Sequence, residues 1–169
     1  MKKNLALTGM MGVGKSTIGR ALSVRLLMQF SDVDQIIERR LDMSIHEIFK
    51  VKGEAFFRKL EEKITIQEAG RKNTIISLGG GAFMNFKIKK NILLSCKSFW
   101  LDLDIKFLEK RLIKSKKRPL LNRKNLSEVL EKIYKERKST YAIASYKIDC
   151  DKLNKNLIID KIIKLYEDN

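Results

Sequence analysis

The sequence contains little of what marks several large classes of protein. Its 169 residues include one proline, one histidine and two cysteines, and no apolar run approaches the length of a membrane span. Cys96 and Cys150 lack metal-type spacing and flank strand-like segments, so we expect ordinary buried thiols. His46 is interpreted as a partly exposed helix residue rather than an acid–base group. These scarcities argue against a cysteine-based metal site and against a membrane protein.

The charge balance is strongly basic, with a formal net charge of +16 at neutral pH. Such a charge can attract anionic substrates or nucleic acid. The lysines are scattered through the chain, however, and aromatic residues do not interleave with them as a nucleic-acid surface requires. We therefore assign the charge to solvated faces and expect no nucleic-acid partner. Glycines from Gly9 onward cut short an N-terminal apolar stretch that would otherwise resemble a signal peptide, so we expect a cytoplasmic protein.

Residues 9–16 match the phosphate-binding loop G-x-x-x-x-G-K-[ST]. The glycines let the backbone turn with positive φ and bring amide N–H groups close to phosphate oxygens. Lys15 supplies a positive charge for the β- and γ-phosphates, and Ser16 offers a hydroxyl to Mg²⁺. An apolar run at residues 4–7 precedes the loop, and helical periodicity follows it over residues 18–26. The pattern predicts a site for a nucleoside triphosphate.

Strand-like runs alternate with helical patterns along the rest of the chain. Runs typical of strands occupy residues 5–7, 29–31, 74–78, 98–103 and 146–148. Helical periodicity separates them, so we expect a single α/β domain over residues 1–169, with helices on both faces of a parallel sheet. Ligands in such folds bind beyond the C-terminal ends of the strands.

Two segments between these elements are candidates for ligand contact. Gly79, Gly80 and Gly81 follow the third strand-like run, where a triple glycine has no packing value and costs chain entropy. Its use would be a close approach of the backbone to a ligand. The only proline, Pro119, lies in a basic stretch without apolar periodicity. We interpret residues 115–124 as a mobile lid over the nucleotide.

Two acidic pairs compete for the Mg²⁺-binding role. Asp32 and Asp34 follow the short second run, and Asp102 and Asp104 follow the strongly apolar fourth run. In each pair a spacing of two places both side chains on one face of an extended chain. Hydrophobicity favours the second pair, because the run before it is more like the strand that carries the Mg²⁺-binding aspartate in phosphate-loop proteins. Residue patterns alone leave the choice open.

Two arginines lie where they could bind an anionic acceptor. Arg58 sits early in a helical pattern that opens with an acidic turn, and Arg137 sits late in another. Guanidinium groups bind carboxylates through paired hydrogen bonds, although an ordinary surface position explains either arginine equally well. The guanine signature Asn-Lys-x-Asp of GTP-binding proteins is absent. A kinase of a small acceptor such as gluconate and a nucleic-acid-dependent ATPase are the alternatives to weigh.

Taken together, the motifs resemble those of shikimate kinases along nearly the full chain. The matching segments are residues 9–17, 30–38, 44–49, 53–61, 79–81, 118–121 and 136–141. The resemblance implies a three-layer α/β/α phosphate-loop fold of the nucleoside-monophosphate-kinase type, with a five-stranded parallel sheet in the order 2-3-1-4-5. It also implies a monomeric enzyme that uses ATP and Mg²⁺ to phosphorylate the 3-hydroxyl of shikimate, a step of aromatic amino-acid biosynthesis.

The same resemblance implies roles for individual residues. Asp34 would take the proton of the acceptor hydroxyl, assisted by Lys15 and by Arg118 of the lid, and residues 33–61 would form a shikimate-binding helical segment. The implied nucleotide-binding residues are Gly12, Val13, Gly14, Lys15, Ser16, Thr17, Arg118 and Arg111, the last of which would stack on adenine. The implied shikimate-binding residues are Asp34, Arg58, Gly79, Gly80, Gly81 and Arg137. Ser16 and Asp32 would hold Mg²⁺, which reverses the choice made on hydrophobicity and makes Asp102 and Asp104 structural.

The chain departs from the family's pattern at three points. The glycine and proline that the family commonly has around Leu27 and Gln29 are absent, so the end of the first helix is not fixed by the sequence. The family's Arg-x-Pro-x-Tyr pattern lacks its proline here, so we expect a less constrained turn after Arg137. His46 stands where the family often has proline.

Overall fold

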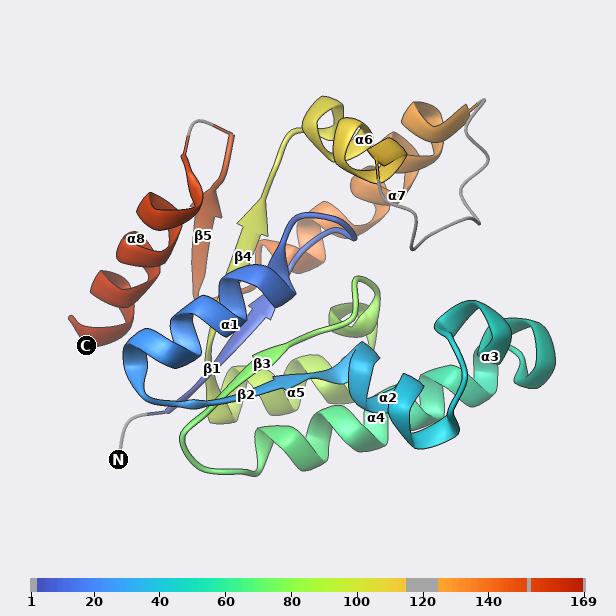
Figure 1. Ribbon diagram of the computed structural model, residues 1–169, viewed down its shortest axis with the longest axis horizontal. Helices are drawn as coiled ribbons and strands as arrows, with labels where there is room; N and C mark the ends of the chain where they lie inside the picture. The colour runs from blue at the N-terminus through green and yellow to red at the C-terminus, as the bar shows by residue number, and fades with distance from the viewer. Residues whose placement is uncertain (1–2, 115–124, 152, 169) are drawn as a thin grey trace.

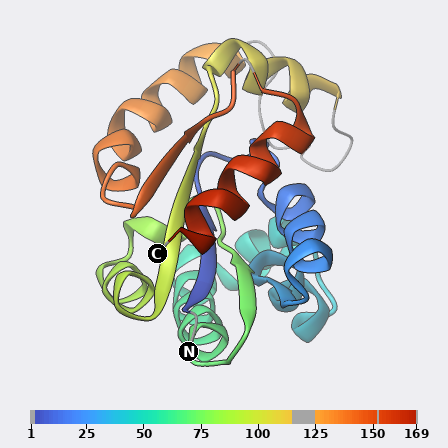
Figure 2. The ribbon, with the colours of Figure 1, turned by 90° about the vertical axis from the view of Figure 1, so that its left-hand side faces the viewer.

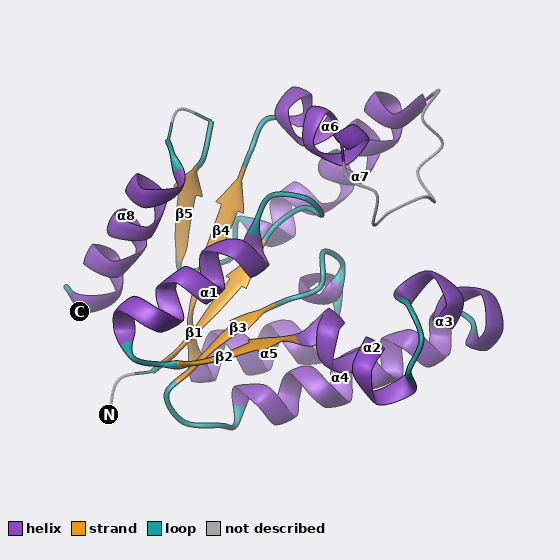
Figure 3. Cartoon of the chain, in the orientation of Figure 1, coloured by secondary structure: helices purple, strands orange, loops and turns teal. Residues whose placement is uncertain are grey.

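The computed structural model describes residues 3–114, 125–151 and 153–168, and at its centre lies a five-stranded parallel sheet (Figures 1 and 3). The strands are β1 (Asn4–Thr8), β2 (Gln29–Asp32), β3 (Thr74–Ser77), β4 (Cys96–Asp102) and β5 (Tyr146–Asp149). Each corresponds to one of the predicted runs. Their order, β2-β3-β1-β4-β5, confirms the expected topology. Because β1 is central, the loop that follows it lies at the middle of the sheet's C-terminal edge.

Helices cover both faces of the sheet. They are α1 (Lys15–Leu26), α2 (Val33–Leu41), α3 (Ile45–Lys52), α4 (Glu54–Ala69), α5 (Phe86–Ser95), α6 (Ile105–Lys114), α7 (Leu126–Tyr141) and α8 (Lys155–Glu167), with a 3₁₀ turn η1 (Ala82–Met84). Figure 2 shows the blue α1 and the red α8 on one side of the sheet, and α5 and the orange α7 on the other. Among the described residues, no helix is both long and apolar enough to cross a membrane.

The end of α1 shows how the chain replaces the family's missing glycine and proline. Leu27 takes a left-handed conformation with φ of 54°, which is uncommon for a residue with a side chain. Its carbonyl accepts a hydrogen bond from the Asn73 side-chain amide at 3.0 Å. The left-handed conformation ends the helix directly before β2 begins, with the Leu27 N–H bonded to the Ser23 carbonyl, and the Asn73 contact joins this end to a distant loop.

The end of α7 differs from the looser turn expected after Arg137. The helix runs without a break to Tyr141, because Ser139, unlike proline, keeps its backbone N–H for the helical ladder. Arg137 and Tyr141 are four residues apart in this continuous helix. They therefore lie on the same face of α7.

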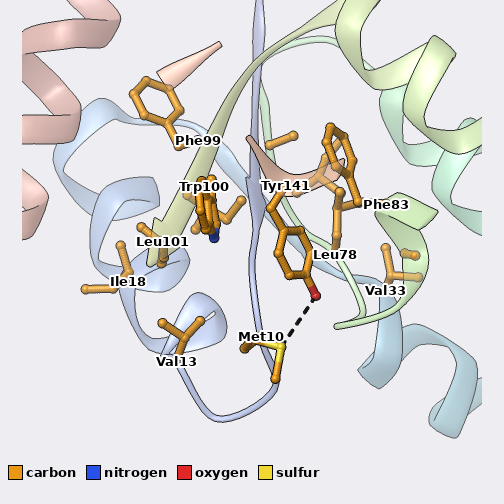
Figure 4. Packing of buried hydrophobic residues seen from close by; sticks show 14 of the residues in the cluster. Met10, Val13, Ile18, Val33, Leu78, Phe83, Phe99, Trp100, Leu101 and Tyr141 are labelled. Atoms are coloured by element: carbon orange, nitrogen blue, oxygen red, sulfur yellow. Dashed lines mark hydrogen bonds between the residues drawn. The ribbon is translucent and has the colours of Figure 1, made fainter. Parts of the chain in front are cut away.

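The core lies on both faces of the sheet and includes the buried strands β1 and β3. Figure 4 shows the part of the core around Trp100 and Tyr141. Tyr141 is fully buried, and its ring stacks on Trp100 with the ring centroids 6.0 Å apart. Cys96 and Cys150 are buried free thiols, as expected, and burial raises the pKa of Cys150 to about 12. His46 is half-buried on α3.

Candidate active site

The phosphate loop joins the C-terminal end of β1 to α1. Gly14, directly before the helix, has φ of 107°, a conformation that only glycine adopts readily. The Lys15 side chain is buried, and its Nζ donates hydrogen bonds to the carbonyl oxygens of Gly9 at 2.8 Å and Met10 at 2.9 Å. The N-terminus of α1 faces the same space. A cation and a helix N-terminus thus lie together, an arrangement that binds phosphate.

A cleft beside this loop brings together residues at and just after the C-terminal ends of three strands, β1, β2 and β3. It is lined by Gly12, Gly14, Lys15, Ser16, Thr17, Asp32, Asp34, Ser77 and Leu78. Of the two acidic pairs, Asp32 and Asp34 line the cleft, whereas Asp102 and Asp104 do not. Asp102 forms an ion pair with Lys147 at 2.8 Å, and Asp104 accepts a hydrogen bond from the backbone at the start of α6.

The two oxygens of the Asp32 carboxylate differ, because only one of them accepts a hydrogen bond within the described part of the chain. Oδ1 accepts a hydrogen bond from the backbone N–H of Gln35 at 3.2 Å and caps α2. Oδ2 is buried and has no hydrogen-bond partner within the described part of the chain. A buried carboxylate oxygen is costly unless a donor or a cation reaches it. Together with the Ser16 hydroxyl in the same cleft, it offers the oxygen ligands that Mg²⁺ prefers, so these residues fit that ion.

The Gly79–Gly81 loop connects β3 to η1 and packs closely against neighbouring segments. A Cβ atom on Gly79 would lie 2.4 Å from Glu61 Oε1 and 2.9 Å from Asp34 Oδ1. A Cβ atom on Gly80 would lie 3.3 Å from the backbone nitrogen of Met11 in the phosphate loop. The expectation that the triple glycine has no packing value was wrong. Its missing side chains let two carboxylates and the phosphate loop approach one another.

Arg58 and Arg137 come from different helices and converge on this glycine loop. Both Nη atoms of Arg58 would lie 3.0 Å from a Cβ atom placed on Gly81. Nη1 of Arg137 donates a hydrogen bond to the carbonyl oxygen of Gly80 at 3.1 Å. Two guanidinium groups at a partly buried loop form a site suited to a carboxylate.

Glu61 belongs to this cluster, although no role was predicted for it. Its Oε2 accepts a hydrogen bond from Arg58 at 2.7 Å, whereas Oε1 is buried without a hydrogen-bond partner among the described residues. Burial raises the pKa of Glu61; Arg58 opposes this effect and Asp34 adds to it. For Arg58, burial would lower the pKa, but the pairing with Glu61 and Glu54 outweighs it and the pKa rises. The three-residue spacing of Arg58 and Glu61 was the available sequence signal.

The other predicted nucleotide-binding residues lie on the phosphate-loop side. Arg111 of α6 donates a hydrogen bond from Nη1 to the Val13 carbonyl at 2.9 Å, so α6 is tied to the loop. Thr17 is exposed in the first turn of α1. Arg118 and the predicted lid, residues 115–124, lie outside the described residues.

The fold and the site define a phosphate-loop kinase that acts on a small molecule, because a phosphate site and an arginine cluster share one edge of a 2-3-1-4-5 parallel sheet. The family model described as shikimate kinase matches residues 11–167. The chain belongs to the shikimate kinase family.

Individual relatives agree with this assignment. The chain is 37% identical over 160 residues to a shikimate kinase of Bartonella henselae, with 95% of this chain and 76% of the relative covered. It is 38% identical over 167 residues to a shikimate kinase of Bacillus subtilis, with coverage of 96% and 88%. A solved structure of shikimate kinase from Acinetobacter baumannii in complex with shikimate is similar with a TM-score of 0.91 at 30% identity, covering 96% of this chain and 92% of that one.

Proposed function

We propose that this protein transfers the γ-phosphate of ATP to the 3-hydroxyl of shikimate and releases shikimate 3-phosphate and ADP. The observation that carries the proposal is the convergence of the phosphate loop, Asp34 and the Arg58–Arg137 pair on one edge of the sheet. Membership of the shikimate kinase family supports the choice of acceptor.

On the donor side, Lys15 and the backbone amides of the phosphate loop would bind the β- and γ-phosphates. Ser16 and Asp32 would hold Mg²⁺, which neutralises phosphate charge when it is bound. The buried Oδ2 of Asp32, which lacks a hydrogen-bond partner among the described residues, supports that assignment. Arg111, already tied to the loop, would stack on adenine.

On the acceptor side, Arg58 and Arg137 would bind the shikimate carboxylate through charge-assisted hydrogen bonds, with the amides of Gly80 and Gly81 nearby. Asp34 would accept the proton of the 3-hydroxyl as that oxygen bonds to the γ-phosphorus and the bond to the ADP oxygen breaks. The residues would accelerate the reaction chiefly by holding the two reactants in line.

The proposal also includes a monomer of one domain that works in the cytoplasm on a small molecule, and on neither nucleic acid nor membranes. The scattered placement of the lysines supports the exclusion of nucleic acid.

A coupled assay of ADP release tests the function. The purified protein is given ATP and Mg²⁺ together with shikimate, gluconate or a polynucleotide, and the product is identified by mass spectrometry. We expect ADP release to require shikimate and to yield shikimate phosphate in equal amount. ADP release that gluconate or polynucleotide stimulates and shikimate does not would refute the proposal, and stimulation by polynucleotide would also fall steeply with salt.

A further inference from the structure

Tyr141 reaches the acceptor side of the site from inside the core. It is the last residue of α7, it is fully buried, and its ring stacks on Trp100. Its hydroxyl donates a hydrogen bond to the Gly80 carbonyl oxygen and lies 4.0 Å from Sδ of Met10 in the phosphate loop (dashed line in Figure 4). One core side chain therefore contacts both loops that form the site.

The Gly80 carbonyl receives a second hydrogen bond from Arg137, on the same face of α7 as Tyr141. A carbonyl oxygen has two lone pairs, so two donors satisfy it fully. These bonds restrain a peptide plane that glycine neighbours would otherwise leave free to rotate. In a planar trans peptide the N–H points opposite to the C=O, so fixing the Gly80 carbonyl also fixes the direction of the Gly81 N–H.

We propose that Tyr141 is a positioning residue for the acceptor. Together with Arg137 it fixes the orientation of the Gly80 carbonyl, and so directs the amide N–H groups of the glycine loop toward the acceptor's carboxylate. The inference rests on the proposed function, which places that carboxylate at this loop. Burial raises the pKa of Tyr141, with Arg137 opposing the effect, so the hydroxyl keeps its proton and stays a donor. The continuous end of α7 makes the arrangement possible, because it places Arg137 and Tyr141 one turn apart.

A pair of matched variants tests the role. Tyr141→Phe removes one hydroxyl and keeps the ring that stacks on Trp100. Tyr134→Phe makes the same change on the same helix, but the hydroxyl of Tyr134 bonds to Asp102, outside the cleft. We expect Tyr141→Phe to raise the KM and the calorimetric Kd for shikimate about three- to tenfold, with the KM for ATP changed less than about twofold. Tyr134→Phe should leave all three values near those of the wild type.

A third variant separates positioning from packing. Trp100→Phe loosens the stacking on Tyr141 but keeps its hydroxyl, so it should lower the thermal unfolding midpoint and leave the KM for shikimate within about twofold of the wild type. A KM for shikimate that rises in Trp100→Phe would identify a packing effect and overturn the inference, even where Tyr141→Phe is too unstable to assay.

Two further outcomes of the Tyr141→Phe kinetics would also overturn it: an unchanged KM for shikimate, or a parallel rise in the KM values for shikimate and ATP. Failure of the proposed function is distinguishable from these results, because wild-type ADP release would then not depend on shikimate at all.

Discussion

Glu61 is buried beside three charged groups, those of Arg58, Asp34 and Arg137, and its protonation is linked to folding. Its folded-state pKa is raised above the ordinary value of 4.5, chiefly by burial. The folded protein therefore holds this proton more tightly than the unfolded chain does. The stabilisation that protonated Glu61 provides is fully present below pH 4.5 and is lost as the pH rises through the raised pKa.

Glu61→Gln should remove this pH dependence, because glutamine does not titrate. We predict that the unfolding free energy of the wild type, relative to that of Glu61→Gln, falls as the pH rises from about 4 to about 8. Urea unfolding at several pH values measures the difference. Glu62→Gln is the control, because hydrogen bonds from Asn85 and Lys87 lower the pKa of Glu62 and its contribution should change with the opposite sign. Equal slopes in both variants would contradict the interpretation.

Asp34→Asn should separate chemistry from nucleotide binding. Asparagine keeps the size of the side chain but cannot take the acceptor's proton, so kcat should fall by about 10²- to 10⁴-fold. The affinity for ATP should stay close to that of the wild type, because Asp34 has no proposed contact with the nucleotide. Steady-state kinetics and a nucleotide titration test both parts, and a near-normal kcat would remove Asp34 from its proposed role.

The Gly79–Gly81 loop is the element where two otherwise separate halves of the site meet. Gly79→Ala should disturb it, because the new Cβ atom would lie within 3 Å of the carboxylates of both Glu61 and Asp34. We predict that kcat/KM for shikimate falls by more than about tenfold, since a misplaced reacting group loses catalysis steeply. Gly70→Ala is the control: its Cβ atom would meet only ordinary contacts, the nearest at 3.5 Å. Unchanged shikimate kinetics in Gly79→Ala would show that the loop tolerates displacement of these carboxylates.

At the scale of single loops and strands, the sequence predicts the structure well. The loop at residues 9–16 encodes the position of Lys15 through its own glycines, and each predicted run forms a strand. The central strands β1 and β3 are buried along their whole length, as a parallel sheet requires, whereas the edge strands β2 and β5 are partly exposed. The strand order, by contrast, came from resemblance to a family. Hydrophobicity favoured Asp102 over Asp32, but the carboxylate of Asp32 lines the cleft. Moreover, the strand of Asp102 lies next to β1, so neither hydrophobicity nor strand position identifies the aspartate that faces the phosphate site.

The sequence patterns did not predict contacts between residues that are far apart in the chain. Tyr141 bonds to Gly80 across 61 positions. Glu61 contacts Gly79 only because α4 packs under the end of β3. Periodicity reports which face of a helix is buried, but it does not report which partner that face meets. The contacts on the acceptor side of the site are therefore visible only in the structure, whereas the phosphate side could be predicted from one short segment of the sequence.

Across the whole molecule, the central claim is that one sheet edge carries two binding sites supplied by different parts of the chain. In the proposed function, Lys15 binds the triphosphate and Arg58 binds the carboxylated acceptor. Removing either residue should therefore affect one ligand and spare the other. Arg71→Ala provides a matched control for Arg58→Ala, because Arg71 also pairs with a buried glutamate three residues away, Glu68, but outside the cleft.

The most direct measurement is calorimetric titration of shikimate and of a non-hydrolysable ATP analogue into the wild type, Arg58→Ala, Arg71→Ala and Lys15→Ala. We predict that Arg58→Ala weakens shikimate binding by more than about tenfold and leaves the analogue unaffected, that Lys15→Ala does the reverse, and that Arg71→Ala changes neither. Shikimate binding that is equally strong in Arg58→Ala and in the wild type, or equal losses of both ligands in either site variant, would contradict the account.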